Sequence, residues 1–253
     1  MKQITDFTLA EKQDFGRSVL LRLRCEQPLP DIAPGQFVQV RVDGSPSTYL
    51  RRPISIHDVD FQRNGIALLV QQAGEGTRHL AAAAVGDLIN MVLPLGNGFT
   101  LPERGENVAL VGGGIGIAPL FYFAKVLNDR GIRPVLLLGG KSKSDLLRLA
   151  DYQQLGETFV TTEDGSLGEK GFVTMHSVWA ERQFDKIYVC GPKPMMKAVA
   201  KLAAEKDTWC EVSLENLMAC GLGACLCCVE DTVDGHVCVC KEGPVFNTRR
   251  LKW

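Results

Sequence analysis

Apolar and polar residues alternate along much of the N-terminal part of the chain. The segments 34–44 (PGQFVQVRVDG), 51–59 (RRPISIHDV) and 65–74 (GIALLVQQAG) show the period of two that is typical of half-buried strands. Gly, Pro and Asp interrupt these runs at short intervals, and one short helix is predicted over residues 76–87. Short strands with frequent turns indicate a small antiparallel β-barrel, which we place at residues 1–102.

The rhythm changes over residues 103–213. Apolar strand candidates (NVALVGGG, RPVLLLGG, TFVTTEDG, DKIYVCGP and TWCEVSLE) alternate there with helix candidates such as PLFYFAKVLNDRG and KPMMKAVAKLAAEKD. This alternation predicts an α/β domain with a doubly wound parallel sheet and helices on both faces. The remaining segment, 214–253, is rich in cysteine and has too little apolar material for a core of its own.

Composition narrows the possible functions. The chain has 253 residues, a formal net charge of −1 and no strongly basic block, so nucleic-acid binding is not expected. Residues 108–124 carry no charge, but this stretch is shorter than the ~20 residues of a membrane-spanning helix and contains several glycines. The first residues are polar and mixed in charge, unlike a signal peptide. We therefore expect a cytoplasmic protein without membrane contact.

Six of the nine cysteines lie between residues 220 and 240. A disulfide framework would be spread along the chain, so this clustering indicates metal ligands. Cys220, Cys225 and Cys228 have the C-x4-C-x2-C spacing of plant-type [2Fe–2S] ferredoxins. Gly221 and Gly223 let the intervening loop wrap closely and direct N–H groups at sulfur atoms. Zinc is the alternative, but zinc sites favour two C-x2-C pairs and the downstream pair here is C-V-C.

The spacing leaves the fourth ligand open. Cys238 and Cys240 would point to the same face of an extended VCVC segment, so periodicity does not choose between them. Cys227 is adjacent to Cys228 and is expected to point elsewhere. Cys25 and Cys210 are expected to be buried thiols without a ligand role.

Two glycine-containing turns in the α/β region predict a nucleotide site. VGGGIGIAPL follows an apolar strand and opens a helix, and Gly113, Gly114 and Gly116 would allow close approach of the backbone to a pyrophosphate. Cys190-Gly191-Pro192 ends a second strand before another helix. Both turns lie at carboxyl ends of strands, where open parallel sheets bind ligands. Alternatively, the first turn only joins strand to helix, and Cys190 only fills a strand end instead of approaching a nicotinamide ring.

These motifs together resemble the ferredoxin–NADP reductase superfamily. Arg52-Pro53-Ile54-Ser55 matches its R-x-Y-S flavin motif, with isoleucine where many members have tyrosine, and the G-G-x-G-x-A-P turn and the late C-G-P are both present. The order LRRPISI, GEGT, GGGIGIAPL, TEDGS, CGP, cysteine loop, KEGPVF is similar to the electron-transfer subunits of NAD-dependent dihydroorotate dehydrogenases. This likeness covers nearly the whole chain.

The resemblance implies roles for individual residues. Arg52 would bind the FAD pyrophosphate, Ser55 would lie near the flavin ring, and Gly76 and Thr77 would donate N–H groups to phosphate from the start of a short helix. Leu69, Val70 and Gln71 would contact the flavin from the next strand. The segment x-x-G-P-V-F follows the fourth cluster ligand in this family, which selects Cys240. The implied cofactor-binding set is Arg52, Pro53, Ile54, Ser55, Leu69, Val70, Gln71, Gly76, Thr77, Gly113, Gly114, Gly116, Cys190, Gly191 and Pro192, with Cys220, Cys225, Cys228 and Cys240 as metal ligands.

The resemblance also implies an activity. NADH gives up a hydride and a [2Fe–2S] cluster takes single electrons, so FAD must lie between them. Dihydroorotate would reduce FMN in a separate catalytic subunit, and electrons would pass through the cluster and FAD to NAD⁺ in pyrimidine biosynthesis. The chain has no spare length for an FMN barrel, so we expect the pyrimidine chemistry to take place in a partner subunit. The resemblance implies a heterotetramer with two copies of each subunit. Alone, the chain would be an NADH diaphorase.

Two other functions fit parts of the pattern. One is another reductase subunit on the same scaffold, a sulfhydrogenase gamma subunit or a transhydrogenase small subunit, although the transhydrogenases carry aspartate in place of one cluster cysteine. The other is a zinc-stabilised binding module without redox activity. For the nucleotide, NADP-using relatives carry an arginine where this chain has Glu163 and Asp164, so NAD is expected. Both carboxylates would alternatively be solvated loop charges.

Overall fold

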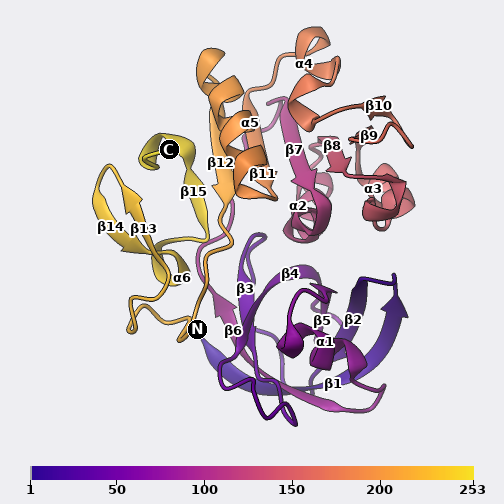
Figure 1. Ribbon diagram of the computed structural model, residues 1–253, viewed down its shortest axis with the longest axis vertical. Coiled ribbons are helices and arrows are strands. Elements are labelled where there is room, and N and C mark those ends of the chain that lie inside the picture. The colour runs from indigo at the N-terminus through magenta and orange to yellow at the C-terminus, as the bar shows by residue number, and fades with distance from the viewer. Residues whose placement is uncertain (1) are drawn as a thin grey trace. The chain divides into compact units, whose positions relative to one another are not determined.

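Six antiparallel strands close into a barrel in the computed structural model, which describes residues 2–253 (Figure 1). The strand order around the barrel is β1-β2-β5-β4-β3-β6. The bounds are β1 Gln3–Asp14, β2 Ser18–Arg24, β3 Phe37–Val40, β4 Arg52–Asp60, β5 Gly65–Gln71 and β6 Leu88–Leu95. In β1, Thr5, Phe7 and Leu9 alternate with exposed residues, as the period of two predicts. The barrel expected from the sequence is therefore present.

A single helix, α1 (Glu75–Ala82), connects β5 to β6. It is shorter than the helix predicted over residues 76–87. Ala83 has an extended backbone with ψ of 141°, and its N–H closes the last turn on the carbonyl of Leu80. The run of alanines favours helix, but Gly86 has φ of +100° and begins the turn into β6, so the helix ends early.

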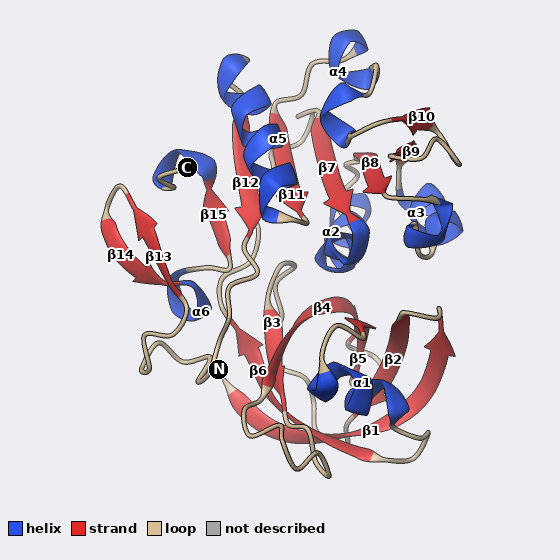
Figure 2. Cartoon of the chain, in the orientation of Figure 1, coloured by secondary structure: helices blue, strands red, loops and turns tan. Residues whose placement is uncertain are grey.

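A seven-stranded sheet forms the core of the second compact unit (Figure 2). Its strand order is β10-β9-β8-β7-β11-β12-β15, with β15 antiparallel to β12 and all other pairs parallel. The strands are β7 Val108–Gly113, β8 Val135–Gly140, β9 Glu157–Thr162, β10 Glu169–Lys170, β11 Lys186–Cys190, β12 Trp209–Ser213 and β15 Val245–Asn247. The helices are α2 Ala118–Asp129, α3 Leu149–Leu155, α4 Val178–Glu181 and α5 Lys193–Glu205.

The strand order reverses direction at β7. From β7 the chain proceeds to β8 and β9 on one side, then returns to β11 and β12 on the other. Right-handed crossovers that run in opposite directions place α2 and α5 on opposite faces of the sheet. The gap between the carboxyl ends of β7 and β11 is therefore the topological switch point, where doubly wound sheets bind ligands.

An aromatic cluster anchors the start of this second unit to its sheet. Phe99 stacks on Phe123 with ring centroids 4.8 Å apart, and both pack edge-on against Tyr188. The Tyr188 hydroxyl donates to the carbonyl of Thr100 at 2.6 Å, and burial raises the pKa of this hydroxyl well above its usual range. The Glu211 carboxylate accepts hydrogen bonds from the backbone and hydroxyl of Thr100. Residues 99 and 100 are thus held by both apolar and polar contacts.

The C-terminal segment is divided between the two units. Residues 215–230 and 236–244 belong with the barrel, and residues 231–235 and 245–253 belong with the sheet. Its elements are β13 Val229–Thr232, β14 Gly235–Cys238 and the one-turn helix α6 Val239–Glu242, followed by β15. Asn97, just after β6, donates from its side chain to the carbonyls of Lys241 and Glu242 and from its backbone to Gly243. The cysteine-rich part is therefore fastened onto the barrel.

No helix among residues 2–253 combines the length and apolar character that crossing a membrane requires.

Candidate cofactor sites

The start of β4 and the first turn of α1 come together on the barrel. A Cβ atom at Gly76 would lie 2.8 Å from the Nε of Arg52 and 3.0 Å from Thr48, so the guanidinium packs directly over this turn. The first N–H groups of a helix lack partners within the helix and carry partial positive charge. The two features form a cationic cradle that fits a pyrophosphate, and any side chain at position 76 would block it.

Thr77 contributes to this cradle through its backbone. Its hydroxyl accepts from the N–H of Gly74 at 3.0 Å and donates to the Gly74 carbonyl. The side chain therefore caps α1, and only its N–H remains for a phosphate. The structure brings together Arg52, Gly76 and Thr77, as the resemblance implied.

Beside the cradle, β4 and β5 separate. Among the described residues, their pairing begins at Asp60 and Gly65 and ends at Ile56 and Leu68. Arg52, Pro53, Ile54 and Ser55 instead pair only with β3, in the register Val40 to Arg52 through Phe37 to Ser55. All four residues are half-buried. The edge of Arg52–Ser55 that faces β5 therefore makes no ladder hydrogen bonds with that strand, and its peptide groups fit contact with a flavin ring.

The three β5 residues named from the sequence follow the last pair that β5 makes with β4. The side chains of Leu69 and Val70 are 2% and 1% exposed, and Gln71 is exposed. Leu69 and Val70 pair with Leu20 and Val19 of β2 on their other edge. Because the side chains of Leu69 and Val70 are buried in the core, these residues would contact a flavin through their peptide groups.

The two glycine turns of the sheet meet at the topological switch point. A Cβ atom at Gly116 would lie 2.5 Å from the carbonyl oxygen of Cys190 and from the backbone of Gly191. A Cβ atom at Gly113 would lie 3.1 Å from Pro192. Gly114 has φ of +54°, a left-handed conformation that suits glycine. The turn after β7 and the turn after β11 thus pack against each other through backbone atoms, an arrangement that fits close approach of a dinucleotide.

Cys190 is fully buried, next to Gly112 of β7 and Ser213 of β12 in the parallel register. This position supports the alternative that the residue fills a strand end. A role at the nicotinamide ring stays a prediction.

The cysteine loop directs backbone N–H groups at thiols. Leu222 N–H donates to the Sγ of Cys220 at 3.3 Å, Gly223 N–H to the Sγ of Cys240 at 3.1 Å, and Cys240 N–H to the Sγ of Cys228 at 3.4 Å. Gly221 and Gly223 have φ of +70° and +84°, so both glycines are required for this wrapping. N–H donors stabilise a sulfur anion, as iron ligation requires.

Two cysteines of the segment behave differently. The Cys227 thiol donates to the carbonyl of Leu217 at 3.7 Å, and the Cys238 thiol donates to the carbonyl of Gly223 at 3.8 Å. These thiols point at acceptors instead of accepting N–H bonds. The contrast supports Cys220, Cys228 and Cys240 as ligands, and Cys225 is linked to Cys220 by both backbone and side-chain contacts.

The electrostatics of these thiols follow from the same contacts. Hydrogen bonding from the Leu222 N–H, with smaller contributions from Cys225 and Ala224, lowers the pKa of Cys220 to about 6. Burial, together with the neighbouring Cys228, raises the pKa of Cys240 to about 12. The hydrogen bond from the Cys240 N–H to the Cys228 sulfur places these two residues beside each other.

Helix α6 gives Cys238 and Cys240 different surroundings, which an extended segment would not do. An extended VCVC was expected to point both thiols to one face, and this was wrong. β14 ends at Cys238 and α6 begins at Val239, so Cys240 lies in the helix and is fully buried, while Cys238 is half-buried. The expectation for Cys25 also needs correction, since this thiol is half-buried beside the carbonyl of Gln27, whereas Cys210 is buried as expected.

Among residues 2–253, no group of three or more His, Cys, Asp or Glu side chains has the arrangement of a single-ion site. A [2Fe–2S] cluster distributes its four cysteine ligands over two irons, so the sulfur atoms around it stand further apart than the ligands of one zinc ion. The donor set of four thiols, three of which accept backbone N–H bonds, fits such a cluster.

Comparisons with known proteins agree with this geometry. Residues 215–252 match the family described as the iron-sulfur cluster binding domain of dihydroorotate dehydrogenase B, and residues 110–201 match the oxidoreductase NAD-binding domain. The chain is 42% identical over 219 residues to the dihydroorotate dehydrogenase B (NAD(+)) electron transfer subunit of Shouchella clausii, covering 84% of each chain. The subunit of the same name from Desulforamulus reducens is 43% identical over 237 residues, covering 88% of this chain and 90% of the relative.

The chain belongs to the family of dihydroorotate dehydrogenase B electron transfer subunits. A solved chain from the NADH-dependent reduced ferredoxin–NADP oxidoreductase is also similar, with a TM-score of 0.88 and 30% identity over 98% of this chain and 90% of that chain. The predicted family, fold class and cofactor set of FAD, [2Fe–2S] and NAD are confirmed. As an electron transfer subunit of an oxidoreductase, a dihydroorotate dehydrogenase B family member works with a catalytic partner subunit. The roles of individual residues stay predictions.

Two residues that were not expected from the sequence position the cysteine loop of this family member. Asn97 holds the backbone of α6, which carries Cys240, from 144 residues away. Gln39 lies fully buried against Gly221. Neither residue stands in a recognisable motif. The one feature of the sequence that could have indicated a role for Gln39 is that it is a polar residue within the otherwise apolar strand FVQV.

For the cluster, we expect alanine at Cys220, Cys225, Cys228 or Cys240 to abolish binding of iron, because each removes one thiolate ligand. Cys227→Ala and Cys238→Ala should retain the wild-type iron content and visible absorbance. Iron and labile sulfide per chain are the measurement. Loss of the cluster in Cys238→Ala together with its retention in Cys240→Ala would show that the fourth ligand is assigned wrongly.

For the flavin, Arg52→Ala is expected to purify with substoichiometric FAD and to bind it roughly 10- to 100-fold more weakly, since hydrogen bonds to a charged group contribute about 1.5–3 kcal/mol. The FAD-to-protein absorbance ratio and titration of the apoprotein measure this. Arg22→Ala is the control, because Arg22 pairs with Glu11 on the exposed barrel surface. Wild-type occupancy in Arg52→Ala would remove this residue from the site.

Proposed function

We propose that this chain accepts electrons from a dihydroorotate-oxidising, FMN-containing subunit and passes them through a [2Fe–2S] cluster and FAD to NAD⁺. Residues 1–102 would bind FAD, residues 103–213 NAD, and residues 214–253 the cluster. The assembly would be a heterotetramer with two copies of each subunit. The relatives named above are electron transfer subunits of dihydroorotate dehydrogenase B, which supports a catalytic partner.

One observation carries the proposal: the cysteine loop and the Arg52–Ser55 segment, the proposed flavin site, belong to the same compact unit. A Cβ atom at Gly221 would lie 2.7 Å from Gln39 and 3.2 Å from Leu95, so the loop packs onto β3 and β6. β3 pairs in turn with the Arg52–Ser55 segment of β4. Electron transfer requires the cluster and the flavin to be held close to each other, which this packing of the cysteine loop on the barrel would achieve. A zinc site that only stabilises the fold would not require it.

The residues have distinct tasks in this mechanism. When bound, FAD exchanges both electron pairs and single electrons, a nicotinamide nucleotide exchanges a hydride, and the cluster exchanges single electrons. Arg52 and the start of α1 hold the FAD pyrophosphate. The glycine turns after β7 and β11 hold the dinucleotide by backbone N–H groups. Leu222, Gly223 and Cys240 direct N–H groups at the cluster thiolates.

Exposed leucines around the cysteines support contact with the catalytic subunit. Leu217 is 87% exposed, and Leu226, which directly follows Cys225, is 66% exposed. Exposed apolar side chains beside a redox site are typical of a surface that binds a partner protein. The nine cysteines form no disulfide among residues 2–253, which supports a reducing compartment such as the cytoplasm.

The acidic turn after β9 bears on the choice of nucleotide. Asp164 is exposed and accepts from the N–H and hydroxyl of Ser166 at 2.9 and 2.6 Å. The hydroxyl contact, reinforced by the N–H, lowers the pKa of Asp164, so it stays ionised throughout neutral pH. The carboxylate thus shapes its own turn and also places a fixed negative charge at the carboxyl edge of the sheet.

For the activity, the isolated chain loaded with FAD and cluster is expected to reduce artificial dyes with NADH and to leave dihydroorotate unoxidised. The reason is that its sites serve electron transfer and the pyrimidine chemistry belongs to the partner. Dye reduction and orotate formation are followed by absorbance. Adding the FMN subunit should restore orotate formation with NAD⁺. Oxidation of dihydroorotate by the FMN-free chain would contradict the two-subunit mechanism.

For the nucleotide, NADH is expected to be preferred over NADPH by at least about tenfold in kcat/KM, which corresponds to roughly 1.4 kcal/mol. The 2′-phosphate of NADPH carries nearly two negative charges and is repelled by Asp164. Asp164→Arg should narrow the gap. Asp164→Asn is the matched variant, because its amide oxygen can still accept from Ser166. Equal or better use of NADPH by the wild type would defeat the prediction.

A further inference from the structure

Gln39 is the polar residue in the middle of the short strand β3, and it is 0% exposed. Its neighbours Val38 and Val40 are also buried, so both faces of the strand are covered. Alternate residues point to opposite faces, which places Gln39 on the same face as Phe37. Phe37 lies near Gly96, where a Cβ atom would also meet Pro244 of the C-terminal segment. This face of β3 is therefore the one that the cysteine-rich segment covers.

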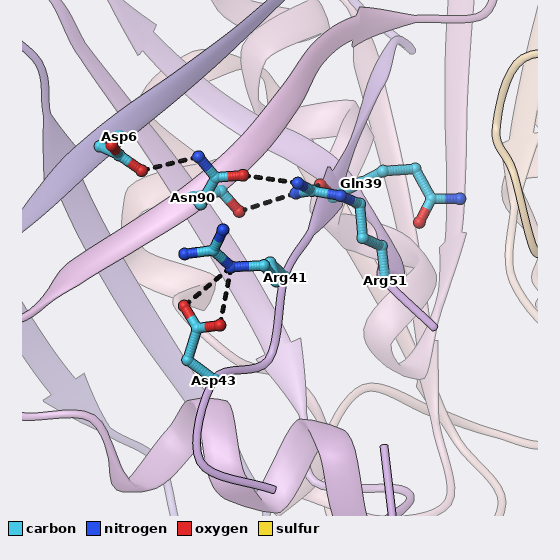
Figure 3. A network of polar contacts seen from close by, with 6 residues as sticks. All are labelled: Asp6, Gln39, Arg41, Asp43, Arg51 and Asn90. Carbon is cyan, nitrogen blue, oxygen red and sulfur yellow. Dashed lines mark hydrogen bonds and ion pairs between the residues drawn. The ribbon is translucent and has the colours of Figure 1, made fainter. Parts of the chain in front are cut away.

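Neither polar atom of the Gln39 side chain has a hydrogen-bond partner among residues 2–253. An apolar side chain would fill such a position without loss, and a buried amide that finds no partner is destabilising. The neighbouring Arg51 makes no hydrogen bond to this side chain. Arg51 donates to the backbone carbonyl of Gln39 and to the side chain of Asn90, which donates in turn to Asp6. In Figure 3 the Gln39 amide extends away from this network.

The amide instead lies against the cysteine loop. A Cβ atom at Gly221 would lie 2.7 Å from the Cγ and 3.0 Å from the Nε2 of Gln39. Gly221 lies between Cys220 and Leu222, whose N–H donates to the Cys220 sulfur. A glutamine that is buried without partners therefore touches the loop that carries a predicted cluster ligand.

We propose that the Gln39 side-chain N–H donates a hydrogen bond to a sulfur atom of the cluster site, either the Cys220 thiolate or a bridging sulfide. This inference rests on the proposed function, because it requires a [2Fe–2S] cluster on the four cysteines. Gln39 is then a positioning residue that ties the loop to β3. It also joins the cluster to the flavin side of the barrel, since Gln39 is in register with Pro53 of the Arg52–Ser55 segment.

The bond has a defined electronic consequence. A hydrogen bond to sulfur stabilises the more negative, reduced cluster and raises its reduction potential. Gln39→Met keeps the length of the side chain and removes the N–H donors. We expect this variant to shift the cluster reduction equilibrium roughly tenfold toward the oxidised form, which is about 59 mV for a one-electron couple. Gln72→Met is the matched control, because Gln72 is a half-buried glutamine on the same barrel whose amide donates to the carbonyl of Gly16.

The test is an EPR-monitored redox titration of the full chain loaded with FAD and cluster. A lower cluster potential in Gln39→Met, with the flavin potential and the Gln72→Met control at wild-type values, is the expected result. An unchanged cluster potential in a folded, cluster-containing Gln39→Met overturns the inference, and so does a shift confined to the flavin. Absence of a [2Fe–2S] signal from the wild type would instead defeat the proposed function.

A second measurement does not depend on the stability of a variant. Wild-type protein labelled with ¹⁵N in glutamine side chains is reduced and studied by pulsed EPR. A weakly coupled ¹⁵N nucleus is expected, because the donor nitrogen of Gln39 would lie beside a sulfur ligand. Lack of any such coupling would overturn the inference even if Gln39→Met failed to retain its cluster.

Discussion

A negatively charged cofactor group needs donors or positive charge around it, and at the proposed sites of this chain most of the donors are backbone N–H groups. The pyrophosphate cradle at α1, the paired turns at the switch point and the cysteine loop all follow this rule. Each depends on a glycine that lets the backbone approach. A Cβ atom at Gly76 would meet Arg52, one at Gly116 would meet Gly191, and one at Gly221 would meet Gln39. The cofactor sites therefore share one physical basis although they lie in different architectures.

Strand pairing in the barrel and in the parallel sheet determines where these motif residues lie. In the barrel, β4 pairs with β5 only from Ile56 onward, so the motif of Arg52–Ser55 is paired on one side only. In the parallel sheet, β7 and β11 pair along their length, and the strand order reverses at β7, so the turns that follow the two strands lead into helices on opposite faces. Both arrangements are consequences of strand pairing.

The cysteine-rich segment has no core of its own and depends on the barrel for its conformation. Asn97 binds three consecutive carbonyl groups around α6, and Gln39 and Leu95 lie beneath Gly221. These contacts hold Cys240 in a buried helical turn while Cys238 stays at the end of a strand. The cluster site is thus a product of the barrel surface as much as of the cysteine spacing.

The sequence by itself determined the barrel, the doubly wound sheet, the family and the order of the cofactor motifs. The reason is that strand periodicity, glycine turns and cysteine spacing are local properties, readable within a few residues. Tertiary structure decided that Cys238 ends a strand while Cys240 lies in helix α6. It also decided that the side chains of Leu69 and Val70 are buried and that the Thr77 hydroxyl caps helix α1. It also decided that Gln39 meets the cysteine loop. Each of these depends on contacts between segments that are distant in the chain or on hydrogen bonds that local propensity does not encode, so only packing could settle them.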